Sequence, residues 1–305
     1  MAIIRIGTRG SMLALAQANE VKQRLLKAHP SLIAEQIEII PIKTTGDKIL
    51  TQNLEDIGGK GLFTKEVEEA LLEGHADIGV HSMKDVPAVN PEPLVIDCIL
   101  PREDPRDAFI SKKYKSLSEL PHGATVGTSS SRRKAQLLTK RPDLHIVPFR
   151  GNVNTRLEKL EKGVAEATLL AIAGLKRINL ADVAADIVNT DILLPAVAQG
   201  AIGIQRRKDD SNIEKLLAPL HHRPTAHCID AERAFLITLD GSCRTPIAAL
   251  AELSGDTLSM RAMIASRDGS TIHQTSRRGK IADAVMMGND AAQELKRIGG
   301  AHFFE

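Results

Sequence analysis

The sequence predicts an α/β protein with two similar βαβ domains on either side of a cleft, followed by a small α+β domain. Strand-like and helix-like segments alternate along the first 200 of its 305 residues. The same order of segments occurs twice, and after Pro219 short stretches of alternating polarity replace it. Such alternation is typical of parallel sheets, which bind ligands at the carboxyl ends of their strands.

The first repeat has three β-branched segments. We expect strands over residues 3–6, 37–42 and 76–80. A helix begins at Ser11, where apolar residues follow at helical spacing. A second helix over residues 65–73 follows a glycine-rich loop, with Thr64 as its predicted N-cap. The third strand runs directly into Lys84 and Asp85, which places both side chains at a strand end.

The second repeat follows the same order. We expect strands over residues 124–126, 144–149 and 167–172, and helices from residue 132 and over 155–162. Residues 127–131 (GTSSS) correspond to residues 7–11 (GTRGS), and the loop before Arg177 corresponds to the loop before Asp85. Residues 201–204 are expected to return to the first sheet as a strand. The order indicates one βαβαβ unit used twice. The alternative is that two unrelated α/β domains share this order by chance.

The last part of the chain predicts a helix, a meander of strands and a final helix. The expected elements are a helix over 226–239, strands over 247–253, 257–265 and 270–277 with hairpin turns at 254–256 and 268–269, and a helix over 282–298. The predicted domains are residues 1–100 with 201–218, residues 101–200, and residues 219–305.

Composition and charge argue against several classes of partner and location. The net charge of +2 gives no case for binding nucleic acid or a membrane surface. No run approaches the roughly 18 apolar residues of a membrane span, and the N-terminus lacks a signal-peptide pattern. We therefore expect a cytoplasmic protein. We also expect a monomer, which none of these observations determines.

The cysteines and histidines give no metal or disulfide pattern. Cys98, Cys228 and Cys243 are odd in number and form no CxxC pair. His221, His222, His227 and Cys228 are close in the sequence, but their spacing matches no common zinc site. We therefore expect no metal.

Six arginines lie at strand ends or in the first turn of the following helix. They are Arg9, Arg132, Arg133, Arg150, Arg156 and Arg177. The planar guanidinium group binds carboxylates at two points, and helix N-termini add unpaired N–H donors. Any one of these side chains can equally be solvated surface. Together they predict a ligand with several carboxylates.

Two further residues are candidates for chemistry. Asp85 stands in a region rich in cations, where a carboxylate can stabilise a developing positive charge and exchange a proton. It can also be a helix N-cap or a partner for Lys84. Cys243 lies in a short loop beside Arg244, and a neighbouring cation favours the nucleophilic thiolate. A lone loop cysteine is often inert, and this alternative stays open from residue type alone.

Six segments together resemble the signature segments of the porphobilinogen deaminases. They are residues 58–63 (GGKGLF), 80–87 (VHSMKDVP), 102–109 (REDPRDAF), 127–133 (GTSSSRR), 150–153 (RGNV) and 194–200 (LPAVAQG). The likeness extends in the right order from about Arg5 to the helix of the third domain. It implies two domains like those of periplasmic binding proteins, and a third that carries a cofactor cysteine.

The resemblance also implies an activity. Cys243 would hold a dipyrromethane cofactor through a thioether. Four porphobilinogen units would each lose ammonia and join the chain, and hydrolysis would then release the linear tetrapyrrole hydroxymethylbilane. Asp85 matches the family's catalytic aspartate. One departure is Ser242, since many members have two glycines before the cysteine.

The remaining roles are carried over residue by residue. The resemblance implies cofactor binding by Lys84, Thr128, Ser130, Arg132, Arg133, Gly151 and Gln199, and substrate binding by Arg9, Ser11, Arg150, Arg156 and Arg177.

Two other classes of protein compete with this interpretation. A binding protein without catalysis explains the duplicated halves and the arginines, but it requires neither Cys243 nor Asp85. A transferase with a cysteine nucleophile needs a histidine partner in a matching loop, and none is evident. The sequence therefore favours the deaminase.

Overall fold

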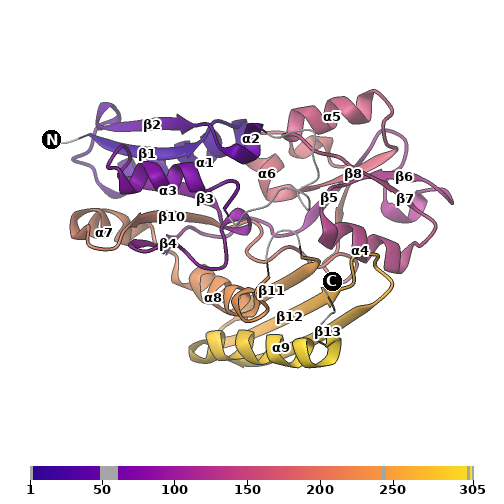
Figure 1. Cartoon of the computed structure of the whole chain (residues 1–305). Helices are drawn as coiled ribbons and strands as arrows, with labels where there is room; N and C mark the ends of the chain where they lie inside the picture. Colours follow the sequence, from indigo (N-terminus) through magenta and orange to yellow (C-terminus); the bar gives the residue numbers. More distant parts are fainter. Residues whose placement is uncertain (1–2, 49–60, 242–244, 301–302, 304–305) are drawn as a thin grey trace. The chain divides into compact units, whose positions relative to one another are not determined.

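The computed structural model describes residues 3–48, 61–241, 245–300 and 303. It contains two five-stranded sheets and one three-stranded sheet (Figure 1). The described residues form two compact units. Unit 1 comprises residues 3–48, 61–103 and 201–226, and unit 2 comprises residues 104–200, 227–241, 245–300 and 303. Each unit is described by itself.

Unit 1 is built on one mixed sheet with the order β2-β1-β3-β10-β4. Its strands are β1 (Ile4–Arg9), β2 (Ile37–Ile42), β3 (Ile78–Ser82), β4 (Leu94–Ile99) and β10 (Ile202–Arg207). Its helices are α1 (Met12–Ala28), α2 (Thr45–Lys48), α3 (Lys65–Leu72) and α7 (Ser211–Leu217), with the 3-10 turns η1 (Ala34–Gln36), η2 (Met83–Asp85) and η5 (Ala218–Leu220). Helix α8 (Arg223–Thr238) begins here.

The predicted return strand is confirmed as β10, and it makes this sheet mixed rather than parallel throughout. β1 pairs in parallel with β2 and β3, whereas β10 is antiparallel to both β3 and β4. A parallel neighbour needs a crossover connection, usually a helix. β10 instead follows the whole second repeat in the chain. No helical crossover therefore links it to a neighbouring strand and makes it parallel to that strand.

Helices α1 and α3 cover opposite faces of this sheet. Ile78 and Val80 share a buried core with Val21 of α1. A Cβ atom placed on Gly79 would lie 3.0 Å from Val67 of α3. Because successive residues of a strand point to opposite faces, the even positions of β3 face α1 and the odd positions face α3.

Unit 2 repeats this arrangement in a second mixed sheet, with the order β7-β6-β8-β5-β9. Its strands are β5 (Asp107–Ser111), β6 (Thr125–Gly127), β7 (His145–Val147), β8 (Ala167–Ala171) and β9 (Asp186–Val188). Its helices are α4 (Ser131–Lys140), α5 (Val153–Glu161) and α6 (Ile172–Arg177), with 3-10 turns η3 (Leu117–Glu119) and η4 (Ala181–Val183). β6 is parallel to β7 and β8, and β5 is antiparallel to its neighbours. The predicted repeat is thereby confirmed strand by strand.

The segment before Arg177 is a helix rather than the predicted loop. Ile172, Ala173 and Leu175 of α6 are buried, and their packing holds the turn in spite of Gly174.

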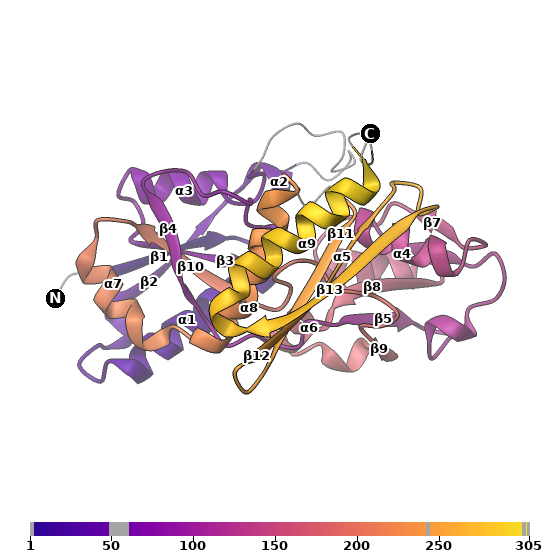
Figure 2. The same ribbon diagram turned by 90° about the horizontal axis from the view of Figure 1, so that it is seen from below.

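Unit 2 also contains the C-terminal meander, β11 (Ile247–Ser254), β12 (Thr257–Ala265) and β13 (Ile272–Lys280). The predicted turn at 254–256 is confirmed, since Ser254 pairs with Thr257 across it. After η6 (Ile281–Asp283), helix α9 (Ala284–Gly299) packs along β12 and β13 (Figure 2). The β12–β13 turn contacts α4, where Thr139 Oγ1 donates to the Gly269 carbonyl at 2.6 Å. The division into three domains stays a prediction.

Within the described part of the chain, no helix combines the length and the apolar character that crossing a bilayer requires.

Candidate active site

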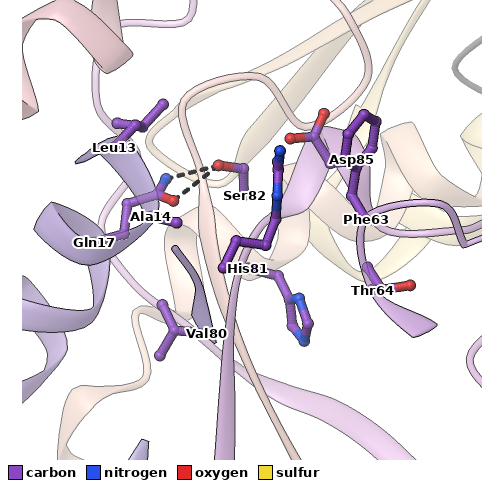
Figure 3. Close-up of a pocket in the computed structure, with 10 residues that line it drawn as sticks. Leu13, Ala14, Gln17, Phe63, Thr64, Val80, His81, Ser82 and Asp85 are labelled. Atoms are coloured by element: carbon purple, nitrogen blue, oxygen red, sulfur yellow. Dashed lines mark hydrogen bonds between the residues drawn. The ribbon is translucent and has the colours of Figure 1, made fainter. Parts of the chain in front are cut away.

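A pocket in unit 1 contains the predicted catalytic carboxylate (Figure 3). It is lined by Arg9, Leu13, Ala14, Gln17, Phe63, Thr64, Val80, His81, Ser82 and Asp85. β3 ends at Ser82, and the 3-10 turn η2 then carries Lys84 and Asp85. The Met83 N–H donates to the Ala201 carbonyl at 3.0 Å, which fixes this turn against the chain entering β10. Lys84 and Asp85 are half-buried, so the carboxylate is held in place yet accessible.

Arg9 at the end of β1 lies beside an aromatic ring. Its guanidinium carbon is 4.3 Å from the centre of the Phe63 ring, within range of a cation–π interaction. Arg9, His81 and Asp85 all line this pocket, and the charges of Arg9 and Asp85 act on His81. The pocket thus combines one carboxylate and one guanidinium with an apolar wall.

Hydrogen bonds inside unit 1 fix the helix that borders the pocket. Ser11 is the N-cap of α1, and its hydroxyl accepts from the Ala14 N–H at 3.3 Å, as predicted for a helix start. Gln17 and Ser82 exchange two hydrogen bonds of 2.8 and 3.0 Å, which join α1 to the end of β3 (Figure 3).

In unit 2, two predicted ligand-binding arginines meet at a buried carboxylate. Arg132 Nη2 lies 2.8 Å from Asp107 Oδ2, and Arg133 Nη2 lies 2.7 Å from Asp107 Oδ1. Their Nη1 atoms donate to the carbonyls of Leu194 and Leu169. Asp107 is fully buried at the start of β5, and both arginines are buried in the first turn of α4.

This buried cluster carries one more positive than negative charge. Burial would raise the pKa of Asp107, but the Arg132 and Arg133 guanidiniums outweigh it and hold that pKa well below its usual range. Burial lowers the pKa of Arg132, against the attraction of Asp107. Among the residues the structure describes, Nε of each arginine is buried and has no hydrogen-bond partner. A buried excess charge with unused donors fits a further anion, such as an acid side chain of a ligand.

Gln199 belongs to the same cluster. Its Nε2 donates to Asp107 Oδ1 at 3.0 Å and to the Pro105 carbonyl at 2.6 Å. The preceding residue, Ala198, has a φ of +60° and donates its N–H to the buried Glu232 carboxylate of α8 at 2.6 Å. Side chains from β5 and α8 therefore hold this connecting segment in its conformation.

Arg150, Gly151 and Arg156 form a separate group at the start of α5. Gly151 has a φ of +118°, and a Cβ there would lie 2.6 Å from Thr155, so this position requires glycine. Arg156 Nε donates to the Gly151 carbonyl at 2.9 Å. Arg150 is half-buried, in contrast to Arg132 and Arg133.

The remaining predicted residues of unit 2 lie at helix ends. Ser130 is the N-cap of α4 and accepts from the Arg133 N–H. Thr128 is buried, and its hydroxyl accepts from the Ser130 N–H at 3.2 Å. Arg177 ends α6 and donates to the Gly200 carbonyl at 3.0 Å. Cys243, with Ser242 and Arg244, lies outside the described residues.

Sequence reasoning assigned no role to Asp107, Phe63, His81 or Gln205. Asp107 could have been singled out, because a carboxylate at the start of the apolar run 108–110 needs a buried cation. In the part of the chain that the structure describes, no group of three or more His, Cys, Asp or Glu is arranged to hold a metal.

Comparison with solved structures gives matches at low sequence identity. A nutrient binding protein from Burkholderia cenocepacia bound to methionine is 16% identical with a TM-score of 0.43, covering 70% of this chain and 90% of that one. An ABC transporter periplasmic substrate-binding protein from Coxiella burnetii is 16% identical with a TM-score of 0.44, covering 76% and 97%.

Sequence comparisons give closer relatives. A porphobilinogen deaminase of Paracoccus denitrificans is 57% identical over 302 residues, which cover 99% of this chain and 96% of the relative. The chloroplastic porphobilinogen deaminase of Oryza sativa is 54% identical over 309 residues, covering 100% of this chain and 86% of the relative. The family profile described as porphobilinogen deaminase, dipyromethane cofactor binding domain, matches residues 4–215, and that of the C-terminal domain matches residues 226–297. The chain therefore belongs to the porphobilinogen deaminase family.

Proposed function

We propose that this chain condenses four porphobilinogen molecules into hydroxymethylbilane, releasing one ammonia for each unit added. The observation that carries the proposal is the pocket in which Asp85 is the one carboxylate among the lining residues, with the Arg9 guanidinium close by. Porphobilinogen becomes positively charged when its amine leaves, and it carries carboxylates elsewhere. A pocket with one carboxylate and one guanidinium matches both requirements.

In this mechanism Asp85 acts on the reacting centre. Its negative charge stabilises the cation formed as ammonia leaves, and its oxygens accept hydrogen bonds from the pyrrole N–H. It also takes up the proton released from the pyrrole carbon after the new bond forms. Arg9 pairs with an acid side chain of the substrate, and its packing on Phe63 sets the direction of the guanidinium.

The residues present fit the dipyrromethane cofactor of the family. The unused Nε donors of Arg132 and Arg133 suit one of its acid side chains, and we assign Lys84, Thr128, Ser130, Gly151 and Gln199 to the same group. Attached to Cys243, the cofactor would supply the free pyrrole carbon to which the first unit is joined, and each later unit would join the free end of the growing chain. Ser11, Arg150, Arg156 and Arg177 bind the acid groups of the substrate and the growing chain. We further propose that the enzyme works as a cytoplasmic monomer with three domains.

The intact mass of the purified protein tests this function. We expect the mass to exceed that of the bare chain by two deaminated porphobilinogen units, and to rise in equal steps when porphobilinogen is added. Cys243→Ser should remove the extra mass, since the thiolate is the only proposed point of attachment. Cys98→Ala should keep it, because burial raises the pKa of the Cys98 thiol to about 12 and holds it unreactive. A bare mass that porphobilinogen does not change would contradict the proposal.

Arg150→Leu should weaken binding without unfolding the chain. Its side chain is half-buried, so we expect a change in the free energy of unfolding of about 0.5 kcal/mol or less. The loss of one charged contact to a carboxylate should raise KM for porphobilinogen about tenfold. Steady-state kinetics and urea unfolding measure the two effects. Lys134→Leu, an exposed position on α4, is the control for removing a surface charge. An unchanged KM would show that Arg150 takes no part in binding.

A further inference from the structure

His81, which lines the Asp85 pocket, belongs to a group of three polar side chains buried between the sheet of unit 1 and α3. His81 of β3 places Nε2 2.9 Å from Oε1 of Gln205 on β10. In the antiparallel β3–β10 pair, Gln205 lies opposite Gly79 and His81 lies opposite Gly203. Each large side chain therefore has a glycine across from it. A Cβ on Gly79 would come within 3.0 Å of His81 Nε2, so the bare glycine leaves room for the ring.

The third side chain is Glu68 on α3, which is also buried. Burial raises its pKa, while the nearby Thr64 hydroxyl and Gln205 amide oppose that shift. Within the described residues, Thr64 Oγ1, Glu68 Oε1 and Gln205 Nε2 are buried and make no hydrogen bond of standard geometry. Groups of this kind are commonly bridged by an internal water. Glu68 thus faces the amide end of Gln205, and His81 faces its carbonyl end.

This arrangement fixes the chemical form of His81. An amide oxygen can only accept, so Nε2 of His81 carries the proton and donates it to Gln205. Burial lowers the pKa of His81 to about 4; the Gln205 bond and the Asp85 charge oppose this shift, and the Arg9 charge adds to it. The ring is therefore neutral at neutral pH. In Figure 3 it points away from the Asp85 carboxylate.

We propose that Glu68 and Gln205 position His81 as a neutral ring behind Asp85, so that the negative charge of Asp85 remains available to the cation forming on the substrate. This inference rests on the proposed function. The charge of Asp85 acts on the His81 ring, so a charged imidazolium would in turn attract that carboxylate and compete with the substrate cation. The groups that act on His81 are the charges of Arg9 from β1 and Asp85 from η2 and the amide of Gln205 from β10, and Glu68 of α3 lies beside that amide. His81 acts through Asp85 and is a positioning residue.

Nitrogen NMR of the holoenzyme labelled in histidine tests the charge state without any substrate. The His81 signals are assigned by their loss in His81→Gln. We expect the neutral form with the proton on Nε2 to persist from pH 8 down to about 5.5, because burial disfavours the charged ring. Titration of His81 close to the ordinary histidine value of about 6.5, or a proton on Nδ1, would overturn the inference.

Gln205→Glu tests the link to catalysis. A carboxylate in place of the amide should protonate His81 at pH 7, lower kcat about tenfold or more with KM little changed, and move the acid limb of the pH profile to higher pH. Gln274→Glu, at an exposed position of β13, is the matched control and should keep the wild-type profile. A charged His81 with unchanged kcat would overturn the inference.

A second variant covers the case in which Gln205→Glu does not fold or leaves His81 neutral. Gln205→Leu removes the acceptor without adding charge. We expect His81 to lose its single tautomer and kcat to fall about threefold or more. An unchanged tautomer would overturn the inference. If the wild-type NMR result holds but porphobilinogen is not consumed, the proposed function fails while the charge state of His81 stands.

Discussion

Asp85→Asn should reduce the turnover of porphobilinogen by about a thousandfold while leaving the fold and the covalent adduct in place. Removing one general acid–base or charge-stabilising group lowers the rate of the chemical step by a factor of about 10²–10⁴. Asp85 is expected to serve both roles. Asparagine has the same size and can still accept a hydrogen bond. The carboxylate is half-buried at the end of η2, and the turn is anchored by the backbone bond from Met83 to Ala201. Stability should therefore change little.

Single-turnover kinetics on protein of verified mass measure this effect, because they separate chemistry from cofactor assembly. Asp209→Asn, an exposed aspartate in the turn after β10, is the matched control and should retain wild-type rates. If Asp85→Asn keeps more than about a tenth of the wild-type rate, Asp85 takes no part in the chemical step. The loss would then be smaller than the smallest loss expected from removing such a group.

The elements with a clear polarity pattern could be predicted from the sequence. The strands at 37–42 and 257–265 have the bounds of β2 and β12, and Ser11 caps α1 where a helix start is predicted. β4 and β5 were missed because prolines at 101 and 105 made their surroundings look like a connection between domains. The antiparallel direction of β10 depends on the route of the whole chain, which no local pattern contains.

The candidate site likewise contains residues that a local pattern predicts and contacts that it does not. Asp85 and Arg9 are placed at strand ends by local periodicity, and the structure brings both to one pocket. The burial of Arg133 was not predictable in this manner, because its partner Asp107 lies 26 positions away in the sequence. Likewise His81 and Gln205 are 124 positions apart. Contacts between distant residues depend on strand register, and register is set by the pairing of the folded sheet rather than by residue type.

Asp107→Asn should destabilise the chain by about 3–5 kcal/mol, because it leaves two buried guanidinium groups with no carboxylate. The neutral amide cannot balance the charges of Arg132 and Arg133, both of which donate to Asp107 at 2.8 and 2.7 Å. It would also disturb Gln199, whose amide donates to the same carboxylate. Urea unfolding measures the loss. Asp143→Asn removes the partner of Arg141, a pair that is only partly buried, and is the control with a much smaller expected loss.

The pH dependence of stability gives this prediction a second test. The pKa of Asp107 is lower in the folded chain than in the unfolded chain, so its contribution is complete above the unfolded value of about 4 and is lost as the pH falls below it. We expect the wild type to lose stability on acidification in that range, and Asp107→Asn to lose much less. If both proteins respond equally to acid, Asp107 is not the counter-charge of the arginines. The excess positive charge that makes Arg132 and Arg133 suitable for a ligand carboxylate would then need another explanation.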